Sequence, residues 1–110
     1  MSLEQRTGLR PRDLELIIQA ARHQPEIERL VLFGSRATGR HRTGSDVDLA
    51  VQGEQVSYAT VLALADQLNE VLPLPYLFDV LDYNTISAPA LREHIDRQGV
   101  PIYTVETGVS

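Results

Sequence analysis

The chain has 110 residues, of which 43% are hydrophobic, and this length predicts one compact domain over residues 1–110. It contains no cysteine, which excludes disulfide cross-links, thiolate zinc sites and a cysteine nucleophile. Its net charge is −5 and all 10 basic residues are arginine, which argues against a protein that coats nucleic acid and excludes lysine-dependent chemistry. With neither a signal sequence nor an apolar stretch of ~20 residues, the chain is expected to be cytoplasmic and without membrane contact.

The first third of the chain predicts a helix, a buried strand and a helical turn. Apolar residues recur at helical spacing after Pro11, which predicts a helix over 11–23. Residues 30–33 form a short apolar run that ends at a glycine and is typical of a buried strand. Residues 34–39 predict a single helical turn with Ser35 as its N-cap.

A second strand follows a polar loop over 40–45. Between residues 46 and 52, Asp46, Asp48 and Ala50 alternate with three apolar residues. The pattern predicts a strand with one apolar face and one acidic face.

The rest of the chain predicts a helix over 57–72, a strand over 76–81, a helix over 88–98 and an edge strand over 100–105. A full helix separates the second and third strands, which favours a parallel crossover, whereas the loop between the first and second favours an antiparallel pair. The predicted fold class is therefore α/β (α+β), a small mixed β-sheet with helices packed on it.

Three aspartates are candidates for metal binding. Asp46 and Asp48 point to the same face of their strand, with Cα atoms roughly 6 to 7 Å apart, although such a pair is also common on a solvated surface. Asp79 interrupts an apolar strand, where burial of an unpaired charge costs several kcal/mol. If the third strand lies beside the second, the three carboxylates form one cluster. Its oxygen ligands suit one or two Mg²⁺ or Mn²⁺ ions.

The turn at Gly34 and Ser35 is a candidate for phosphate binding. Backbone N–H groups and a serine hydroxyl between a strand and a helix can hold phosphate oxygens. Arg36, Arg40 and Arg42 flank this turn and could contact phosphate. Each of these features also has a purely structural interpretation, as a common turn and as surface arginines.

Two other ligand-binding motifs do not fit the sequence. Gly34 and Gly39 have the spacing of a P-loop, but Arg40 and His41 replace its Lys-Ser/Thr pair. A calcium loop starting at Asp46 lacks the required ligands downstream. The three histidines have no metal-ligand spacing and are interpreted as surface groups: His23, His41 and His94.

Gly34-Ser35, ten residues, then Asp46-x-Asp48, with Asp79 in a later strand, resembles the nucleotidyltransferase signature of the DNA polymerase beta-like superfamily. The length and the Gly-Ser-Arg-Ala start are most similar to the minimal nucleotidyltransferase (MNT) family. The resemblance covers about residues 11–98, with its specific part in 33–49 and 78–81. It implies a polymerase beta-like nucleotidyltransferase fold.

The resemblance also implies roles for individual residues. Asp46 and Asp48 would bind two Mg²⁺ ions, and Asp79 would bind the catalytic metal and accept or relay the acceptor proton. Gly34 and Ser35 would hold the triphosphate of ATP, with Arg36 beside them. MNT proteins are commonly antitoxins that transfer AMP from ATP to a tyrosine of a helical HEPN ribonuclease toxin, so a HEPN-type partner is expected.

Two further functions stay open at this point. A protein-binding antitoxin that neutralises its toxin without catalysis is favoured by the small size and by Thr38, which stands where the family often has arginine. Transfer to a small molecule such as an aminoglycoside ranks last, because relatives with that activity carry an additional acceptor domain. A homodimer is compatible with each function.

Overall fold

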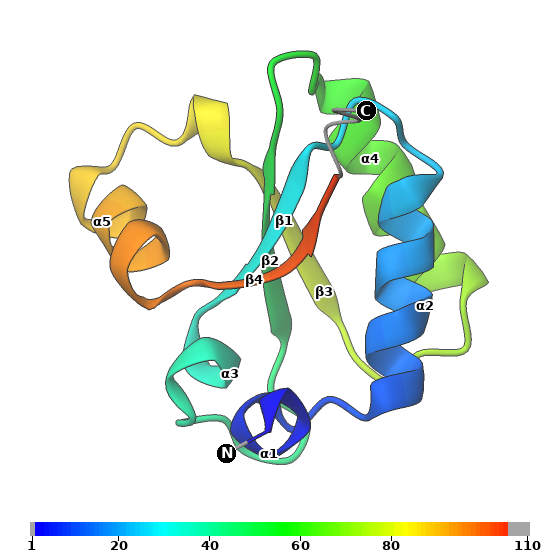
Figure 1. Ribbon diagram of the computed structural model, residues 1–110, viewed down its shortest axis with the longest axis vertical. Helices are drawn as coiled ribbons and strands as arrows, with labels where there is room; N and C mark the ends of the chain where they lie inside the picture. Colours follow the sequence, from blue (N-terminus) through cyan, green and yellow to red (C-terminus); the bar gives the residue numbers. More distant parts are fainter. Residues whose placement is uncertain (1, 106–110) are drawn as a thin grey trace, which may run out of the picture.

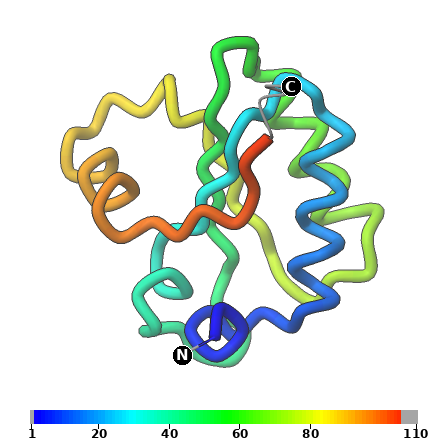
Figure 2. Tube along the Cα trace, viewed as in Figure 1, coloured from blue at the N-terminus to red at the C-terminus, as the bar shows by residue number. Residues whose placement is uncertain are grey.

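The computed structural model describes residues 2–105, which form a four-stranded sheet with helices on both faces (Figures 1 and 2). No helix in this part of the chain is long and apolar enough to cross a membrane. The elements in chain order are α1 (Leu3–Thr7), α2 (Pro11–Arg22), β1 (Arg29–Phe33), α3 (Ser35–Thr38), β2 (Val47–Gln52), α4 (Tyr58–Asp66), the π-helical turn η1 (Gln67–Val71), β3 (Phe78–Asp82), the 3-10 turn η2 (Tyr83–Thr85), α5 (Pro89–Gln98) and β4 (Val100–Thr104).

The strand order is β3-β2-β1-β4, so β2 and β1 are central and β3 and β4 are edges. β1 is antiparallel to both β2 and β4, whereas β2 and β3 are parallel. The parallel pair is joined through α4 and η1, which supply the long connection that parallel strands require. The predicted mixed sheet and both predicted strand orientations are confirmed.

The two faces of the sheet bury different side chains. Alternate residues such as Leu30, Val47 and Leu49 face α2 and α4 and form the larger core. The opposite set, including Val31 and Ala50, packs against α5 in a smaller core. In Figure 1, α2 and α4 lie on one side of the sheet and α5 on the other, while α1 and α3 lie together at its lower end.

The structure differs from the sequence prediction in local details. α1 was not predicted; it begins with a capping box in which the side chains of Ser2 and Gln5 each accept a hydrogen bond from the other residue's backbone N–H. The predicted N-cap role of Ser35 is wrong, because Gly34 is the N-cap and makes no side-chain bond. The helix predicted over 57–72 changes to a π-helical turn at Gln67.

Candidate active site

The parallel pairing of β2 and β3 brings the three aspartates to one face of the sheet. Asp48 and Asp79 are direct partners in the register, and side chains of partner residues share a face. Asp46 lies two residues before Asp48, just ahead of β2, and so points the same way. All three carboxylates thus lie on the α5 face of the sheet, where β2 and β3 begin.

The three carboxylates have different surroundings. Asp46 and Asp79 are exposed. Asp79 faces solvent because β3 is an edge strand, so it does not carry the cost of an unpaired charge buried in an apolar strand. Asp48 is half-buried. Burial raises the pKa of Asp48, the charges of Asp79 and Asp46 raise it further, and only His94 acts in the opposite direction. The cluster has unbalanced negative charge centred on Asp48.

Residues 2–105 contain no group of three His, Cys, Asp or Glu side chains drawn together as a ready ligand set for a metal ion. Ionised carboxylates repel one another, and exposed side chains can take rotamers that separate them. The donors that Asp46, Asp48 and Asp79 offer are carboxylate oxygens only, which is the chemistry that Mg²⁺ and Mn²⁺ prefer. By donor type and by charge, these residues fit a divalent cation.

The Gly34 turn lies against the carboxylates. Phe33 at the end of β1 pairs with Asp48 of β2, so the turn that follows β1 starts beside Asp48. Gly34 has a φ of 76°, and a Cβ atom there would lie 2.2 Å from Oδ2 of Asp48. Only glycine satisfies both conditions. The structure thereby brings together the two halves of the sequence signature, the glycine turn and the Asp-x-Asp strand.

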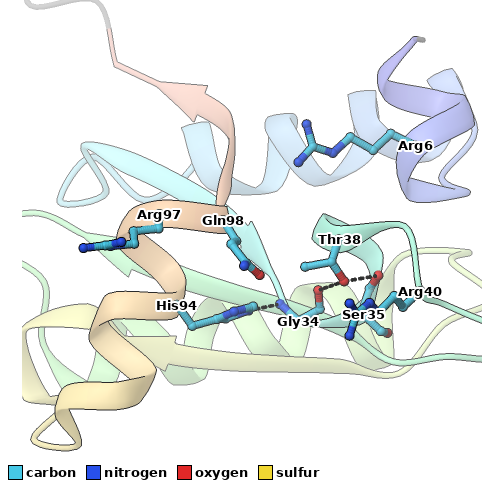
Figure 3. Close-up of a pocket in the computed structure, with 8 residues that line it drawn as sticks. All are labelled: Arg6, Gly34, Ser35, Thr38, Arg40, His94, Arg97 and Gln98. Carbon is cyan, nitrogen blue, oxygen red and sulfur yellow. Dashed lines mark hydrogen bonds between the residues drawn. The ribbon is translucent and has the colours of Figure 1, made fainter.

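A cavity of about 710 Å³ opens beside this turn, between α1 and α3 on one side and α5 on the other (Figure 3). Gly34, Ser35 and Arg40 are among the residues that the sequence analysis named as candidates for phosphate binding. The opposite wall comes from α5, and Arg6 reaches in from α1. The lining residues are Arg6, Gly34, Ser35, Thr38, Arg40, His94, Arg97 and Gln98. Three of them are arginines, so the cavity favours an anion.

His94 was interpreted as a surface group, but it is part of this cavity. Its Nε2 accepts a hydrogen bond of 3.0 Å from the backbone N–H of Gly34 (Figure 3), and its ring stands edge-on to Phe33 at 6.2 Å. The bond joins α5 to the turn after β1 across a separation of 60 residues. No local spacing in the sequence signals it, because only the packing of α5 on the sheet brings the two residues together.

Arg36 has a different position from the one expected. Its side chain is buried and donates hydrogen bonds of 2.9 Å to the carbonyl oxygens of Thr7 and Ser45. Its guanidinium also lies 5.0 Å from the centre of the Tyr76 ring. Arg36 does not line the cavity and instead ties α1, α3 and the loop before β2 together. The structure brings Arg6, Arg40 and Arg97 to the cavity in its place.

The fold and these residues define a nucleotidyltransferase-type domain. Residues 15–107 match the family described as "Polymerase beta, Nucleotidyltransferase", and the chain belongs to this family. No curated protein matches the chain.

Solved structures with a similar fold include toxin–antitoxin complexes. One, determined with AMP-PNP, is 24% identical over 86% of this chain and 75% of its own, with a TM-score of 0.70. A mutant of the toxin–antitoxin MntA-HpeT is 25% identical over 82% of this chain and 71% of its own, with a TM-score of 0.65. A putative nucleotidyltransferase from Sulfolobus solfataricus is 19% identical, covers 86% of this chain and 79% of its own, and has a TM-score of 0.53. The predicted polymerase beta-like fold and the resemblance to minimal nucleotidyltransferases are confirmed.

Proposed function

We propose that this chain is a metal-dependent nucleotidyltransferase, an antitoxin that transfers AMP from ATP to a tyrosine of a HEPN-type toxin in the cytoplasm. One observation carries the proposal. Asp48 and Asp79 are partners on adjacent strands with Asp46 two residues before Asp48, and Gly34, which lines the arginine-rich cavity, lies directly against Asp48. Nucleotidyl transfer needs this combination of clustered carboxylates and a neighbouring anion site.

The cavity is suited to the triphosphate of ATP. Its volume of about 710 Å³ lies within the ~300–1,000 Å³ range of small-molecule sites. Arg6, Arg40 and Arg97 supply positive charge from three different parts of the chain. Ser35 lines the same cavity (Figure 3). The AMP-PNP complex of a toxin–antitoxin with this fold supports ATP as the nucleotide.

Asp46, Asp48 and Asp79 would hold the divalent cations, with Mg²⁺ the ion that the donor set favours and Mn²⁺ a substitute. Bound there, a pair of such ions supplies neutralising charge to the attacking and leaving oxygens of an in-line displacement. The acceptor hydroxyl oxygen forms a bond to the α-phosphorus, and the bond from this phosphorus to the β-phosphate bridging oxygen breaks. Pyrophosphate leaves, and the acceptor proton passes to the exposed carboxylate of Asp79.

The acceptor is proposed from the relatives and from the openness of the site. The toxin–antitoxin complexes with this fold contain a second protein, which supports a toxin as the partner. Asp79 is exposed on the edge strand β3 and Asp46 is exposed just ahead of β2, so a hydroxyl group of another protein can approach them.

The test is transfer of label from α-³²P-ATP to the purified product of the adjacent gene, in the presence of Mg²⁺. We expect labelling by the wild-type chain and none by the Asp46→Asn/Asp48→Asn variant, because this variant removes two of the proposed ligands. Glu15→Gln, an exposed acid on α2 and away from the site, is the matched control and should leave labelling unchanged. Labelling at an equal rate by the Asp46→Asn/Asp48→Asn variant would contradict the proposed catalysis.

A second candidate is an antitoxin that neutralises its toxin by binding alone. Exposed apolar side chains near α4 and β3 favour it, because a binding surface needs such groups. The same variants distinguish the two functions. If Asp46→Asn/Asp48→Asn still neutralises the toxin in cells, without any labelling of the toxin, binding alone explains the protein's action.

A further inference from the structure

Most of the large exposed hydrophobic side chains belong to one segment of the chain. Residues 2–105 contain five large exposed ones, and four of them belong to the segment 58–77. Tyr58 is 76% exposed and Leu77 is 72% exposed, values far outside those of core residues. We call the four residues of this segment the α4–β3 face: Tyr58, Leu62, Val71 and Leu77. The fifth residue, Leu3, lies on α1.

The α4–β3 face runs along the edge strand β3. Tyr58, Leu62 and Asn69 follow helical spacing along α4 and η1. At one end of this line, Asn69 exchanges hydrogen bonds of 2.8 and 3.1 Å with the backbone of Phe78, the first residue of β3. At the other end, Tyr58 lines a cavity of about 220 Å³ together with Asp82, the last residue of β3. The helical segment therefore lies beside the whole length of the edge strand.

The same part of the chain is acidic. Seven carboxylates and no arginine or lysine occur between residues 43 and 91. Asp66 and Glu70 are exposed on the helical segment beside these apolar residues, and Asp79 is exposed on β3, on the other face of the sheet. This charge repels the phosphates of nucleic acid and attracts a basic surface. Apolar side chains within acidic surroundings are complementary to a basic amphipathic segment of another protein.

We propose that the α4–β3 face is a docking surface for the partner protein, and that it takes a segment whose apolar side chains are flanked by arginine or lysine. The inference rests on the proposed function, which needs a protein acceptor, and adds where that protein binds. The carbonyl oxygen of Leu77 accepts a hydrogen bond of 2.9 Å from the N–H of Val47. This places Leu77 beside Asp46, so a partner on the face reaches the carboxylate cluster from the β3 edge.

The test measures the affinity of the full chain for the adjacent-gene product by isothermal titration calorimetry. Tyr58→Ser/Leu62→Ser should raise Kd at least ~10-fold, because buried anchors dominate the energy of a protein interface. Leu3→Ser replaces an exposed apolar residue elsewhere and should leave Kd unchanged. Because the replaced side chains are exposed, thermal unfolding of these variants should stay close to that of the wild type.

A second pair of variants tests the charge of the face. Asp66→Arg/Glu70→Arg should weaken binding and slow association, whereas Glu15→Gln, an exposed acid on α2, should do neither. Wild-type affinity should fall as the salt concentration rises.

Three outcomes would overturn the docking surface: equal Kd values for the face variants and for Leu3→Ser, no binding by the wild type, or loss of self-association in sedimentation instead of loss of partner binding. The last would assign the face to a second copy of the chain. Wild-type binding without transfer of label contradicts only the proposed catalysis. Binding that the face variants leave unchanged contradicts only the docking surface.

Discussion

Gly34 is the residue at which the glycine turn and the aspartate strand meet. Its contact with Asp48 explains in physical terms why a glycine and an aspartate 14 positions later belong to one motif. The distance along the chain is bridged by the antiparallel pairing of β1 and β2, which puts Phe33 opposite Asp48. At this scale, the residues of the motif could be predicted from the sequence because each has a chemical character that suits phosphate or metal.

Gly34→Ala should abolish or severely reduce transfer of AMP. The new Cβ atom would lie 2.2 Å from Oδ2 of Asp48, and the backbone φ of 76° is unfavourable for alanine by about 1–3 kcal/mol. Gly39→Ala is the control for a positive φ without a clash, since Gly39 also has a φ of 76° but nothing within 4 Å of the added atom. The ψ of Gly34, −154°, lies in a region that only glycine adopts, whereas the ψ of Gly39, 13°, is left-handed helical, so Gly34→Ala combines strain with the clash. Thermal unfolding and labelling assays compare the two variants. Equal activity of the two variants would contradict a role for this close approach.

Arg36 and Arg40 should respond differently to replacement. Arg36→Gln should lower the unfolding free energy by about 1–3 kcal/mol, because buried carbonyl groups of Thr7 and Ser45 lose their donors. Arg40→Gln should leave stability unchanged and weaken the binding of AMP-PNP, because Arg40 is exposed and lines the cavity. Denaturant unfolding and calorimetric titration measure the two effects. If Arg36→Gln instead weakened the binding of AMP-PNP and left stability unchanged, Arg36 would belong to the nucleotide site.

Elements were predicted well where hydrophobic periodicity is long or strong. The two central strands and the helices α2, α4 and α5 follow from their apolar spacing. α1 has five residues and only one buried side chain, Thr7, so it leaves no periodic pattern to recognise. The π-helical turn at Gln67 depends on how the end of α4 packs against β3. The spacing of apolar residues therefore does not predict it.

The link between α2 and the loop before β3 predicts a pH dependence of stability. Burial raises the pKa of Asp13, but hydrogen bonds from Arg10 and Tyr76 outweigh it and hold the pKa below its usual 3.8. A depressed folded pKa gives stability that is present above pH 3.8 and is lost as the pH falls through the folded pKa. We expect the unfolding free energy to decrease in this range.

Asp13→Asn should remove this part of the pH dependence and lower stability at pH 7. Tyr76→Phe should raise the pKa of Asp13 and cost about 1.5–3 kcal/mol, the value of a hydrogen bond to a charged group. Urea unfolding between pH 2 and pH 7 measures both effects. An unchanged pH profile for Asp13→Asn would show that other groups dominate acid unfolding.

The distribution of charge over the whole molecule makes nucleotide binding depend on cations. Asp48 lies against Gly34, which lines the cavity, and Asp79 is its partner on the next strand. Asp46, Asp48 and Asp79 have a summed charge of −3, which repels a triphosphate, whereas two divalent ions would change this sum to +1. Without these ions, only the positive charges of Arg6, Arg40 and Arg97 along the cavity would oppose this repulsion.

AMP-PNP should therefore raise the melting temperature when Mg²⁺ is present and have little effect in EDTA. A ligand at 100 times its Kd adds about 2.7 kcal/mol to the free energy of unfolding, which a thermal shift assay detects. The Asp46→Asn/Asp48→Asn variant should lose the Mg²⁺-dependent part of the shift. An equal shift in EDTA and in Mg²⁺ would contradict a cation-dependent site.

The sequence by itself determined the order of the elements from α2 onward, the mixed sheet and the identity of the acidic and glycine residues. These follow from local periodicity and from the chemistry of single side chains. Only the tertiary structure decided that Arg36 is buried against Thr7 and Ser45, that His94 bonds to Gly34, and that Arg6 and Arg97 line the cavity. Each of these contacts joins segments about 9 to 60 residues apart, and such contacts depend on how helices pack on the sheet rather than on neighbouring residues.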